Sequence, residues 1–375
     1  MDRPLEPDFS ALFPERTSPF PDNFNDSSVR GRRVLITGAG GSIGAALARR
    51  ILESSPKRLI LLDHSERALY GLQCELDGRE SAEATRFVLR DVRDDGIVEA
   101  LLAHEKPEII FHAAAFKHVP MLEQNPFAAV ENNGLATWRL ARNAAKSGVG
   151  RMLLISTDKA ANPRSMLGVS KRLAELAMLR WNAASTRMSA LRLGNVAGSS
   201  GSVLPAFCKQ LARGGPLTVT HSEATRYFLT MRETCAAIGA LASVQNASGL
   251  FVPDMGEAVS IMKLAERMIG ASEPKGREKI VMKITGLRPG DKLSEDLLSR
   301  GETLGTEIAP GIRRICAETI SADWMDAKFA RIEQITKLRD LGALLQVLKE
   351  VVPEFQPGAT IANLSATAVA GGGND

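Results

Sequence analysis

Three glycines in the segment TGAGGSIG have a spacing that suits the binding of a phosphate group. Gly38, Gly41 and Gly44 follow the apolar run VLIT, and a segment of helical periodicity begins near Ser42. A residue without a side chain lets the backbone turn tightly, and it lets a pyrophosphate approach the amides at the positive end of a helix. Ser42 and Ile43 lie within this turn and are predicted to contact the same ligand.

The context of the glycine turn favours a dinucleotide over an ordinary loop. Asp63 ends the second apolar run, where a carboxylate can accept both hydroxyls of an adenosine ribose and repel a 2′-phosphate. The position favours NAD, while the nearby Arg67 keeps NADP as the less favoured cofactor. Asp63 could also cap the helix near Ser65. Asp91, at the end of the third run, could accept the adenine amino group or act as a cap, and Val92 follows it.

Small residues after the fourth apolar run predict the floor of the cofactor site. Ala113 and Ala114 would let the nicotinamide half of the dinucleotide lie close, and His112 before them is interpreted as scaffold. Lys117 and His118 follow on a loop and could face the substrate. A lone histidine on a loop is, however, more often a hydrogen-bonding scaffold than a ligand.

Six short apolar runs alternate with helix-length connections from Arg33 onward. The runs cover residues 34–37, 59–63, 86–92, 108–114, 152–157 and 190–196. Near-continuous apolar strands with such connections indicate strands buried on both faces of a parallel sheet. The sequence therefore predicts an α/β fold with a doubly wound parallel sheet, the NAD(P)-binding Rossmann fold, and its ligand crevice at the carboxyl ends of the strands.

The chain of 375 residues is expected to divide into an arm, two ordered regions and a tail. Residues 1–30 carry five prolines and predict an extended arm, and residues 31–197 form the NAD-binding domain. Shorter, Gly- and Pro-punctuated segments predict a smaller substrate region over 198–356, interleaved with the end of the sheet. Within it, residues 326–350 have the spacing of one packing helix. The Ala-, Gly-, Ser- and Thr-rich tail 357–375 is predicted to be disordered.

The composition restricts the class of partner. Lys and Arg number 47 and Asp and Glu 43, and a net charge of +4 is too small for a nucleic-acid groove or a membrane-binding face. The four cysteines lie far apart, which gives neither a metal site nor a secreted disulfide framework. No apolar run approaches the roughly 20 residues of a membrane span, and the N-terminus has no signal-peptide pattern. We expect a cytoplasmic protein with a small-molecule ligand.

Several long blocks resemble the extended short-chain dehydrogenase/reductase superfamily. They include SIGAALARR, HAAAFKHVP, STDKAANP and GVSKR. More narrowly, blocks such as LLDHSERALYGLQCEL and TGLRPGDKLSEDL resemble the polysaccharide-biosynthesis branch of nucleotide-sugar 4,6-dehydratases that act on UDP-N-acetylglucosamine. The resemblance runs from Gly31 to Pro357. It implies the soluble catalytic unit, without the membrane spans that many members carry, with NAD as cofactor, a UDP-sugar as substrate and a homo-oligomeric state.

The resemblance also assigns catalytic roles at the end of the fifth predicted strand. Lys159 would be the base that takes the C5 proton, Asp158 the acid that protonates the departing C6 hydroxyl, and Thr157 a hydrogen-bond partner of the C4 oxygen. An amine base must be neutral and an acid must be protonated, and we expect a desolvated cleft to shift both pKa values in those directions. From the residues alone, Asp158 and Lys159 could equally form an ordinary ion pair.

One position departs from the superfamily pattern. Lys171 matches the lysine that binds the nicotinamide ribose, but Leu167 occupies the place of the usual catalytic tyrosine four residues earlier. Members that retain the C5 configuration typically have methionine there, and here Met166 stands one place before it. Asn133 matches a family asparagine that positions the catalytic strand.

A UDP-sugar needs amide-like contacts for uracil and cations for the diphosphate. Asn195 is predicted to end the sixth strand beside the diphosphate and sugar. Arg226 and Arg288 are the diphosphate candidates, although each could be a solvated surface arginine. The remaining predicted substrate residues are Lys117, His118, Ser202, Val203 and Lys209.

These observations leave three functions open. The first is dehydration of UDP-N-acetylglucosamine to a 4-keto-6-deoxy sugar for surface glycan synthesis. The second is epimerisation of the same sugar at C4, and the third is an NAD-binding regulatory protein without catalysis, which Leu167 makes worth testing. The pair Asp158 and Lys159 favours dehydration, because an epimerase has no leaving group to protonate.

Overall fold

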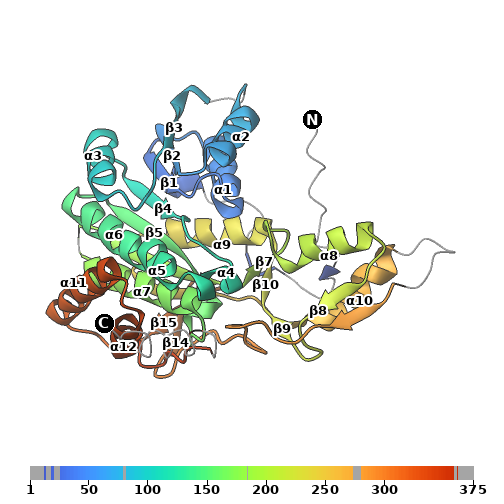
Figure 1. The fold of residues 1–375 in the computed structure, drawn as a ribbon. Helices are drawn as coiled ribbons and strands as arrows, with labels where there is room; N and C mark the ends of the chain where they lie inside the picture. Colours follow the sequence, from blue (N-terminus) through green and yellow to red (C-terminus); the bar gives the residue numbers. More distant parts are fainter. Residues whose placement is uncertain are drawn as a thin grey trace.

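The computed structural model describes residues 12–13, 18–20, 26–78, 82–183, 185–272, 280–358 and 361. Most of the predicted arm (1–30) and of the predicted tail (357–375) therefore lies outside the described residues. The described chain forms one large sheet flanked by helices, with a smaller region of short strands at one side (Figure 1).

Nine described strands form the central sheet. They are β1 (Arg33–Thr37), β2 (Arg58–Asp63), β3 (Thr85–Leu89), β4 (Ile109–His112), β5 (Arg151–Thr157), β6 (Arg187–Leu193), β11 (Gly249–Pro253), β14 (Thr303–Ala309) and β15 (Ile312–Cys316). Their order is β14-β15-β11-β6-β5-β4-β1-β2-β3. Strands β1 to β6 and β11 are parallel, whereas β15 and β14 are antiparallel additions at one edge. The α/β fold with a doubly wound, mostly parallel sheet is confirmed, and the antiparallel edge was not predicted.

The helices lie on both faces of this sheet. One layer contains α1 (Ser42–Glu53) and α9 (Met231–Ser243), which contact each other. The other contains α3 (Asp95–Glu105), α6 (Ala136–Lys146) and α7 (Met166–Trp181), and α2 (Glu66–Leu76) connects β2 to β3. A short stretch before α6 comprises α4 (Val119–Gln124), α5 (Pro126–Ala129) and a π-helix (Val130–Leu135).

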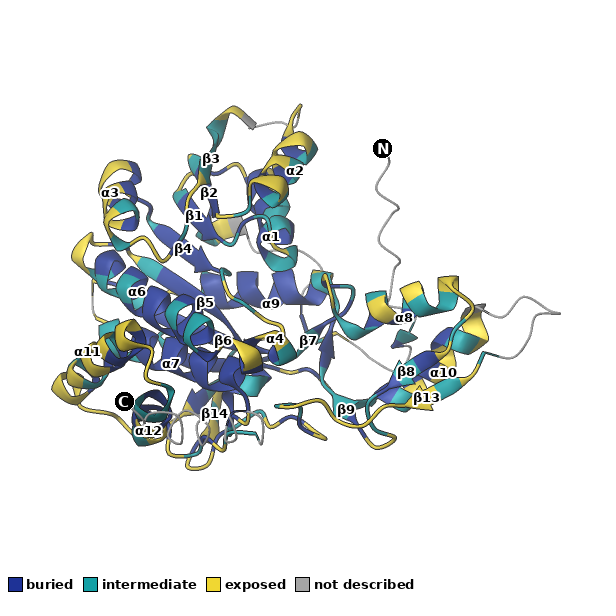
Figure 2. Ribbon diagram, in the orientation of Figure 1, coloured by how far each residue is buried: buried dark blue, intermediate teal, exposed yellow. Residues whose placement is uncertain are grey.

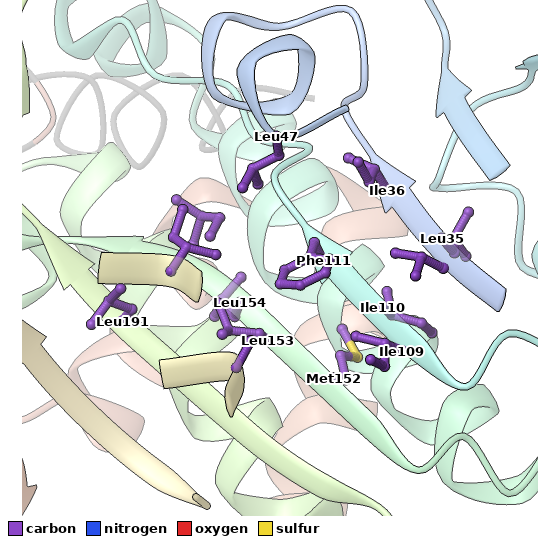
Figure 3. Packing of buried hydrophobic residues seen from close by; sticks show 14 of the residues in the cluster. Leu35, Ile36, Leu47, Ile109, Ile110, Phe111, Met152, Leu153, Leu154 and Leu191 are labelled. Carbon is purple, nitrogen blue, oxygen red and sulfur yellow. The ribbon is translucent and has the colours of Figure 1, made fainter. Parts of the chain in front are cut away.

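The main hydrophobic core lies between the sheet and its helices. Leu35, Ile36 and Phe111 are among its fully buried members, and Leu47 of α1 packs onto the same strands (Figure 3). Figure 2 shows the central strands of the sheet in the buried class, while the outward faces of the helices are exposed. Burial on both faces, which the apolar runs predicted, therefore holds for the central strands. It is wrong for β3, whose residues are half-buried or exposed because β3 is the edge strand.

Two predicted strand ends are also corrected. β3 ends at Leu89, so Asp91 lies two residues beyond it, and β6 ends at Leu193. Asn195 instead begins the separate short strand β7 (Asn195–Val196), which pairs with β10 (Phe228–Leu229). The apolar runs extend past the strands because Val92 and Val196, which lie beyond the strand ends, are buried although the residues just before them are not.

The smaller region combines three two-stranded sheets with two helices. Besides β7 and β10 it contains β8 (Leu217–Val219), β9 (Thr225–Arg226), β12 (Val259–Ser260), β13 (Met282–Ile284), α8 (Val203–Ala212) and α10 (Ile261–Ser272). Its own apolar core includes Phe207 and Phe228, and the ring of Phe13 packs 5.2 Å from that of Phe228. The predicted domain boundary at residue 197 stays a prediction.

The single packing helix predicted over 326–350 is two helices. α11 (Ala322–Leu338) and α12 (Leu341–Val351) are separated because Arg339 adopts a left-handed conformation, with φ of 57°, and Asp340 caps α12. Both pack against α7 and the π-helix region through a second apolar cluster. Among the described helices, none has the combined length and apolar character of a membrane span.

Candidate active site

The turn between β1 and α1 has no room for side chains. At Gly38, where φ is +69°, an added Cβ would lie 2.5 Å from the backbone nitrogen of Ala114, and at Gly44 it would lie 2.1 Å from the carbonyl oxygen of Gly38. Gly40, which the motif spacing did not single out, has the same property, because a Cβ there would lie 2.6 Å from that of Ala68. The glycines therefore keep the turn close to β4 and α2.

A cavity of about 480 Å³ opens above this turn at the carboxyl ends of the strands. The predicted residues that line it are Gly38, Gly41, Asp63, Asp91, Val92, Ala113, Ala114 and His118. Leu62, His64, Phe116, Asn132 and Ser200 also line it and were not predicted. Of the other predicted cofactor residues, Ile43 packs toward the core and Gly44 lies buried inside α1. The sequence therefore predicted about half of the residues that line the cavity.

Asp63 holds the glycine turn in place. Its buried carboxylate accepts hydrogen bonds from the backbone N–H groups of Gly40, at 2.9 Å, and Ser65, at 2.8 Å. The helix cap is Ser65, whose hydroxyl accepts from Ala68. The capping alternative for Asp63 is therefore wrong, and the carboxylate lies at the cavity wall.

Asp91 lies at the same wall and pairs with Arg93, the shorter contact being 2.6 Å from Nη2 to Oδ2. This hydrogen bond lowers the pKa of the Asp91 carboxyl. The N-cap of α3 is Asp94, so the capping alternative for Asp91 is also wrong.

His112 is a buried scaffold, as the sequence predicted. Its Nδ1 lies 2.6 Å from the hydroxyl of Thr37 and its Nε2 lies 2.8 Å from that of Thr137. Burial, with a further contribution from the charge of Lys171, lowers the pKa of His112 to about 3. A neutral imidazole thus joins β1, β4 and α6 beneath the cavity.

Asn133 lies in the π-helix and connects the loop after β4 to α7. Its Oδ1 accepts from the N–H of Phe116 at 2.9 Å, and its Nδ2 donates to the carbonyl of Phe116 and to the hydroxyl of Ser170. Lys171, the next residue of α7, donates to the carbonyl of Ile155 in β5 at 2.7 Å. Asn133 therefore fixes both the loop that lines the cavity and the helix that carries Lys171.

Lys171 is fully enclosed by protein. Burial lowers the pKa of Lys171 to about 8, although the charge of Glu175 acts in the opposite direction. One turn earlier, Leu167 and Met166 are both buried in the apolar cluster beneath α11 and α12. Neither side chain can exchange a proton, so neither residue replaces the catalytic tyrosine of the superfamily pattern.

The predicted catalytic group forms a compact cluster at the end of β5. Asp158 is completely buried, and its Oδ1 accepts from the hydroxyl of Thr157 at 2.9 Å and from Nζ of Lys159 at 3.0 Å. Nζ of Lys159 also donates to Oδ1 of Asn195 at 3.2 Å and lies 3.4 Å from Oε1 of Glu295. Oδ2 of Asp158 has no hydrogen-bond partner in the part of the chain that the structure describes.

The expected direction of the Lys159 pKa shift is wrong. Burial acts to lower the pKa of Lys159, but attraction to Asp158 and Glu295 outweighs it, and the pKa is raised. Arg226 opposes this attraction without reversing it. The lysine is therefore charged in the protein without substrate, and the cluster holds it as an ammonium group.

The remaining predicted substrate residues are not gathered into one pocket. The guanidinium of Arg226 donates to the backbone carbonyls of Thr225, Leu293 and Lys292, and its Nε lies 3.6 Å from Oε1 of Glu295. The guanidinium of Arg226 thus joins β9 to the segment that carries Lys292 and Leu293.

Arg288 is more accessible, with 59% of its side chain exposed and an ion pair to Asp291 at 2.9 Å. Burial lowers the pKa of Lys117 and also that of His118, where Lys117 and Arg288 add to the effect. Ser202 precedes α8 with its hydroxyl buried, Val203 is half-buried and Lys209 is exposed.

A buried charge network behind the cluster was missed. Glu175 accepts from the hydroxyl of Ser156 at 2.7 Å and from Arg192 at 2.7 Å, and Arg192 also donates to Glu302 at 2.6 Å. Glu175 and Arg192 are completely buried. Arg192 lies in the apolar run ALRLGNV, and a charge inside such a run is the signal that could have revealed it.

Glu295 was also missed, although it lies in the block TGLRPGDKLSEDL that carries part of the family resemblance. Nothing in the local sequence distinguishes it from the neighbouring acids, because only the fold brings it to Lys159. Among the described residues, no group of three or more His, Cys, Asp or Glu side chains is placed to hold a metal ion.

Comparison with known proteins identifies the family of the chain. Residues 34–316 match the family model described as polysaccharide biosynthesis protein. The probable polysaccharide biosynthesis protein EpsC of Bacillus subtilis (strain 168) is 40% identical over 298 residues, which cover 79% of this chain and 49% of that protein. The UDP-N-acetylglucosamine 4,6-dehydratase (inverting) of Campylobacter jejuni subsp. jejuni serotype O:23/36 (strain 81-176) is 29% identical over 279 residues, which cover 73% of this chain and 79% of that protein.

A solved structure shares the fold. The DesIV double mutant, a dTDP-glucose 4,6-dehydratase from Streptomyces venezuelae with NAD and DAU bound, superposes with a TM-score of 0.63 and 22% identity, covering 72% of this chain and 88% of that one. The chain spans about half the length of EpsC and of the capsular polysaccharide biosynthesis protein CapD of Staphylococcus aureus. Because the family model covers residues 34–316, the chain belongs to the polysaccharide biosynthesis protein family of extended short-chain dehydrogenases/reductases.

Proposed function

We propose that this protein is an NAD-dependent UDP-N-acetylglucosamine 4,6-dehydratase that serves surface polysaccharide synthesis. The observation that carries the proposal is the cluster at the end of β5, where the buried carboxylate of Asp158 lies 3.0 Å from the amine of Lys159 and has one oxygen without a partner among the residues that the structure describes. An acid beside a base is what a β-elimination of water requires. A C4 epimerase would need no proton donor for a leaving group.

The residues around the large cavity fit a dinucleotide. The turn at Gly38 and Gly44 leaves no room for a Cβ, which keeps it close to β4, and the first N–H groups of α1, which begins at Ser42, would bind the pyrophosphate. Asp63 would bind the adenosine ribose and favours NAD over NADP, and Ala113 and Ala114 form the floor on the nicotinamide side. NAD, when bound, accepts a hydride from the sugar and returns it.

The protons of the reaction balance on Asp158 and Lys159. Transfer of one proton from Nζ of Lys159 to Asp158, across 3.0 Å, gives a neutral amine and a carboxylic acid without a proton from solvent. The amine then takes the C5 proton, while Asp158 protonates the C6 hydroxyl, which leaves as water. Both groups thereby regain their charges. Lys159 afterwards returns this proton to C5 and becomes neutral. The C4 hydroxyl loses its own proton when C4 is oxidised, and that proton restores the charge of Lys159.

The test is the mass of the product after incubation of the purified protein with NAD and UDP-N-acetylglucosamine. Loss of one water supports the dehydratase. An unchanged mass with altered stereochemistry would instead indicate the epimerase, and unchanged substrate would indicate an NAD-binding protein without catalysis.

The role of Lys159 is tested with Lys159→Ala, which should abolish dehydration, a loss of at least about a thousandfold, and leave NAD binding largely intact. A matched control is Lys337→Ala, since Lys337 is an exposed lysine that pairs with Glu333 on the surface of α11. Normal turnover by Lys159→Ala would show that another group is the C5 base.

A further inference from the structure

Glu295 is a buried acid that the proposed mechanism leaves without a role. It lies between β13 and β14, only 2% of its side chain is exposed, and its Oε1 is 3.4 Å from Nζ of Lys159. Its Oε2 is buried and has no hydrogen-bond partner among the described residues. A buried carboxylate with an unsatisfied oxygen costs free energy, and such groups are retained where they serve a site.

Glu295 lies on a different segment of the chain from Asp158 and Asn195, the other two partners of Lys159. Asp158 follows β5 and Asn195 begins β7, and they contact Nζ at 3.0 Å and 3.2 Å. The loop that carries Glu295 adds a third contact, so three segments that are distant in sequence fix one amine. Lys159 and Glu295 also border a cavity of about 10 Å³, which is about the volume needed to hold one water molecule.

Charged groups of both signs surround the amine of Lys159. Asp158 and Glu295 attract it, and Arg226 repels it from beyond Glu295. Arg164, Asp291 and Lys292 border the small cavity.

A purely structural role for Glu295, as the counter-ion of Arg226, explains less of this geometry. Arg226 already donates to three backbone carbonyls, at 2.7, 3.0 and 2.8 Å, and its Nε stands 3.6 Å from Oε1 of Glu295. The guanidinium is therefore held in place without the carboxylate. The contact to Lys159 is the shorter of the two that Glu295 makes to charged groups.

We propose that Glu295 is a positioning residue for Lys159: its carboxylate holds the amine against Asp158 and stabilises its charged form in the protein without substrate. The inference rests on the proposed function in that Lys159 is the base of the elimination. Two carboxylates around one amine give a resting state in which the proton stays on Lys159. The proton shift to Asp158 then has to occur against the field of Glu295, so Glu295 determines how readily the neutral amine forms.

The test is a direct titration of Lys159 in the absence of any sugar. Lysine labelled with ¹³C at the ε carbon is followed by NMR from neutral to alkaline pH, and the signal of Lys159 is assigned by its loss in Lys159→Met. In Glu295→Gln, a change that keeps the size of the side chain, we expect the midpoint for Lys159 to fall by about one pH unit or more, a tenfold loss of proton affinity. An unchanged midpoint would overturn the proposal.

Two further variants separate charge from folding. Asp296→Asn lies in the same loop, but Asp296 is half-exposed and pairs with Lys292, so the Lys159 midpoint should not move. A midpoint that fell equally in Asp296→Asn would show that the effect is a general disturbance of the loop and would overturn the proposal. Glu295→Asp keeps the charge, and we expect its midpoint to lie above that of Glu295→Gln.

This titration fails or succeeds separately from the proposed function. If the product mass shows no dehydration while the midpoint still falls in Glu295→Gln, the contact between Glu295 and Lys159 stands and the reaction is a different one. If dehydration occurs and the midpoint does not move, Glu295 has no positioning role.

Discussion

His112 shows how a single buried residue ties stability to pH. Its pKa is about 3 in the folded protein and 6.5 ordinarily, because the imidazole is buried near the charge of Lys171. The folded pKa is the lower one, so the contribution of His112 to stability is complete above pH 6.5 and is lost as the pH falls toward 3. At pH 4 we expect the loss from this group to be about 3 kcal/mol.

The measurement is the free energy of unfolding in urea at pH 7 and pH 4 for the wild type and His112→Gln. The variant should be less stable at pH 7, because the hydroxyls of Thr37 and Thr137 lose part of their bonding, but its stability should fall less on acidification. An identical decline in both proteins would show that folding does not lower the pKa of His112.

At this scale the sequence predicted positions better than protonation states. Gly38 and Gly44 could be identified because their requirement is local: a tight turn followed by a helix. The pKa shift of Lys159 was predicted with the wrong sign, because attraction to the adjacent Asp158, and then to Glu295, outweighs burial. Glu295 comes from a loop far along the chain, and no local pattern places it there.

At the scale of elements, the buried network around Glu175 joins α7 to β5 and β6. Glu175 and Arg192 are both completely buried and bond at 2.7 Å, while Arg192 also reaches Glu302, just before β14. Glu175→Gln should therefore destabilise the protein by about 3 kcal/mol, because it leaves the charge of Arg192 with a single carboxylate. Glu350→Gln, which affects a partly exposed pair with Lys328, should cost much less, because water screens that pair.

Urea unfolding of the two variants at neutral pH compares these costs. Equal losses in Glu175→Gln and Glu350→Gln would mean that the network adds no more than a surface pair. Activity should fall with stability in Glu175→Gln, since glutamine has one acceptor oxygen where the carboxylate has two, and Ser156, one residue before Thr157, then competes with Arg192 for it.

The elements themselves were predictable where one face or both faces are apolar throughout. The six runs correspond in order to β1 to β6, because a strand covered by helices on both sides must be continuously apolar. The seventh described parallel strand, β11, was not among them. The edge strand β14 and its neighbour β15 escaped prediction because exposed polar residues interrupt their apolar pattern, which reads as loop. The break between α11 and α12 depends on one left-handed residue, Arg339, and helical spacing continues across it.

At the scale of the whole molecule, the loop after β7 crosses from the smaller region to the cofactor cavity. The N–H of Ser200 donates to the hydroxyl of Ser42, the first residue of α1, at 3.1 Å, and Ser200 lines the cavity. Gly201 lies against the ring of His118, so that an added Cβ would be 2.5 Å from Cε1. The proposed dehydratase would return its cofactor unchanged at each cycle and so gain from slow release of NAD, and this loop borders the cofactor cavity through Ser200.

Gly201→Ala should therefore accelerate the dissociation of the dinucleotide by about tenfold, since the new methyl group must displace the loop or His118. The rate is measured by stopped-flow displacement of NADH, whose fluorescence reports release. Gly256→Ala is the matched control, because Gly256 also has a positive φ, +64° against +71°, but nothing lies within 4 Å of its added Cβ. If both variants release NADH at the same rate, backbone strain explains the change and the contact between the loop and His118 does not retain the cofactor.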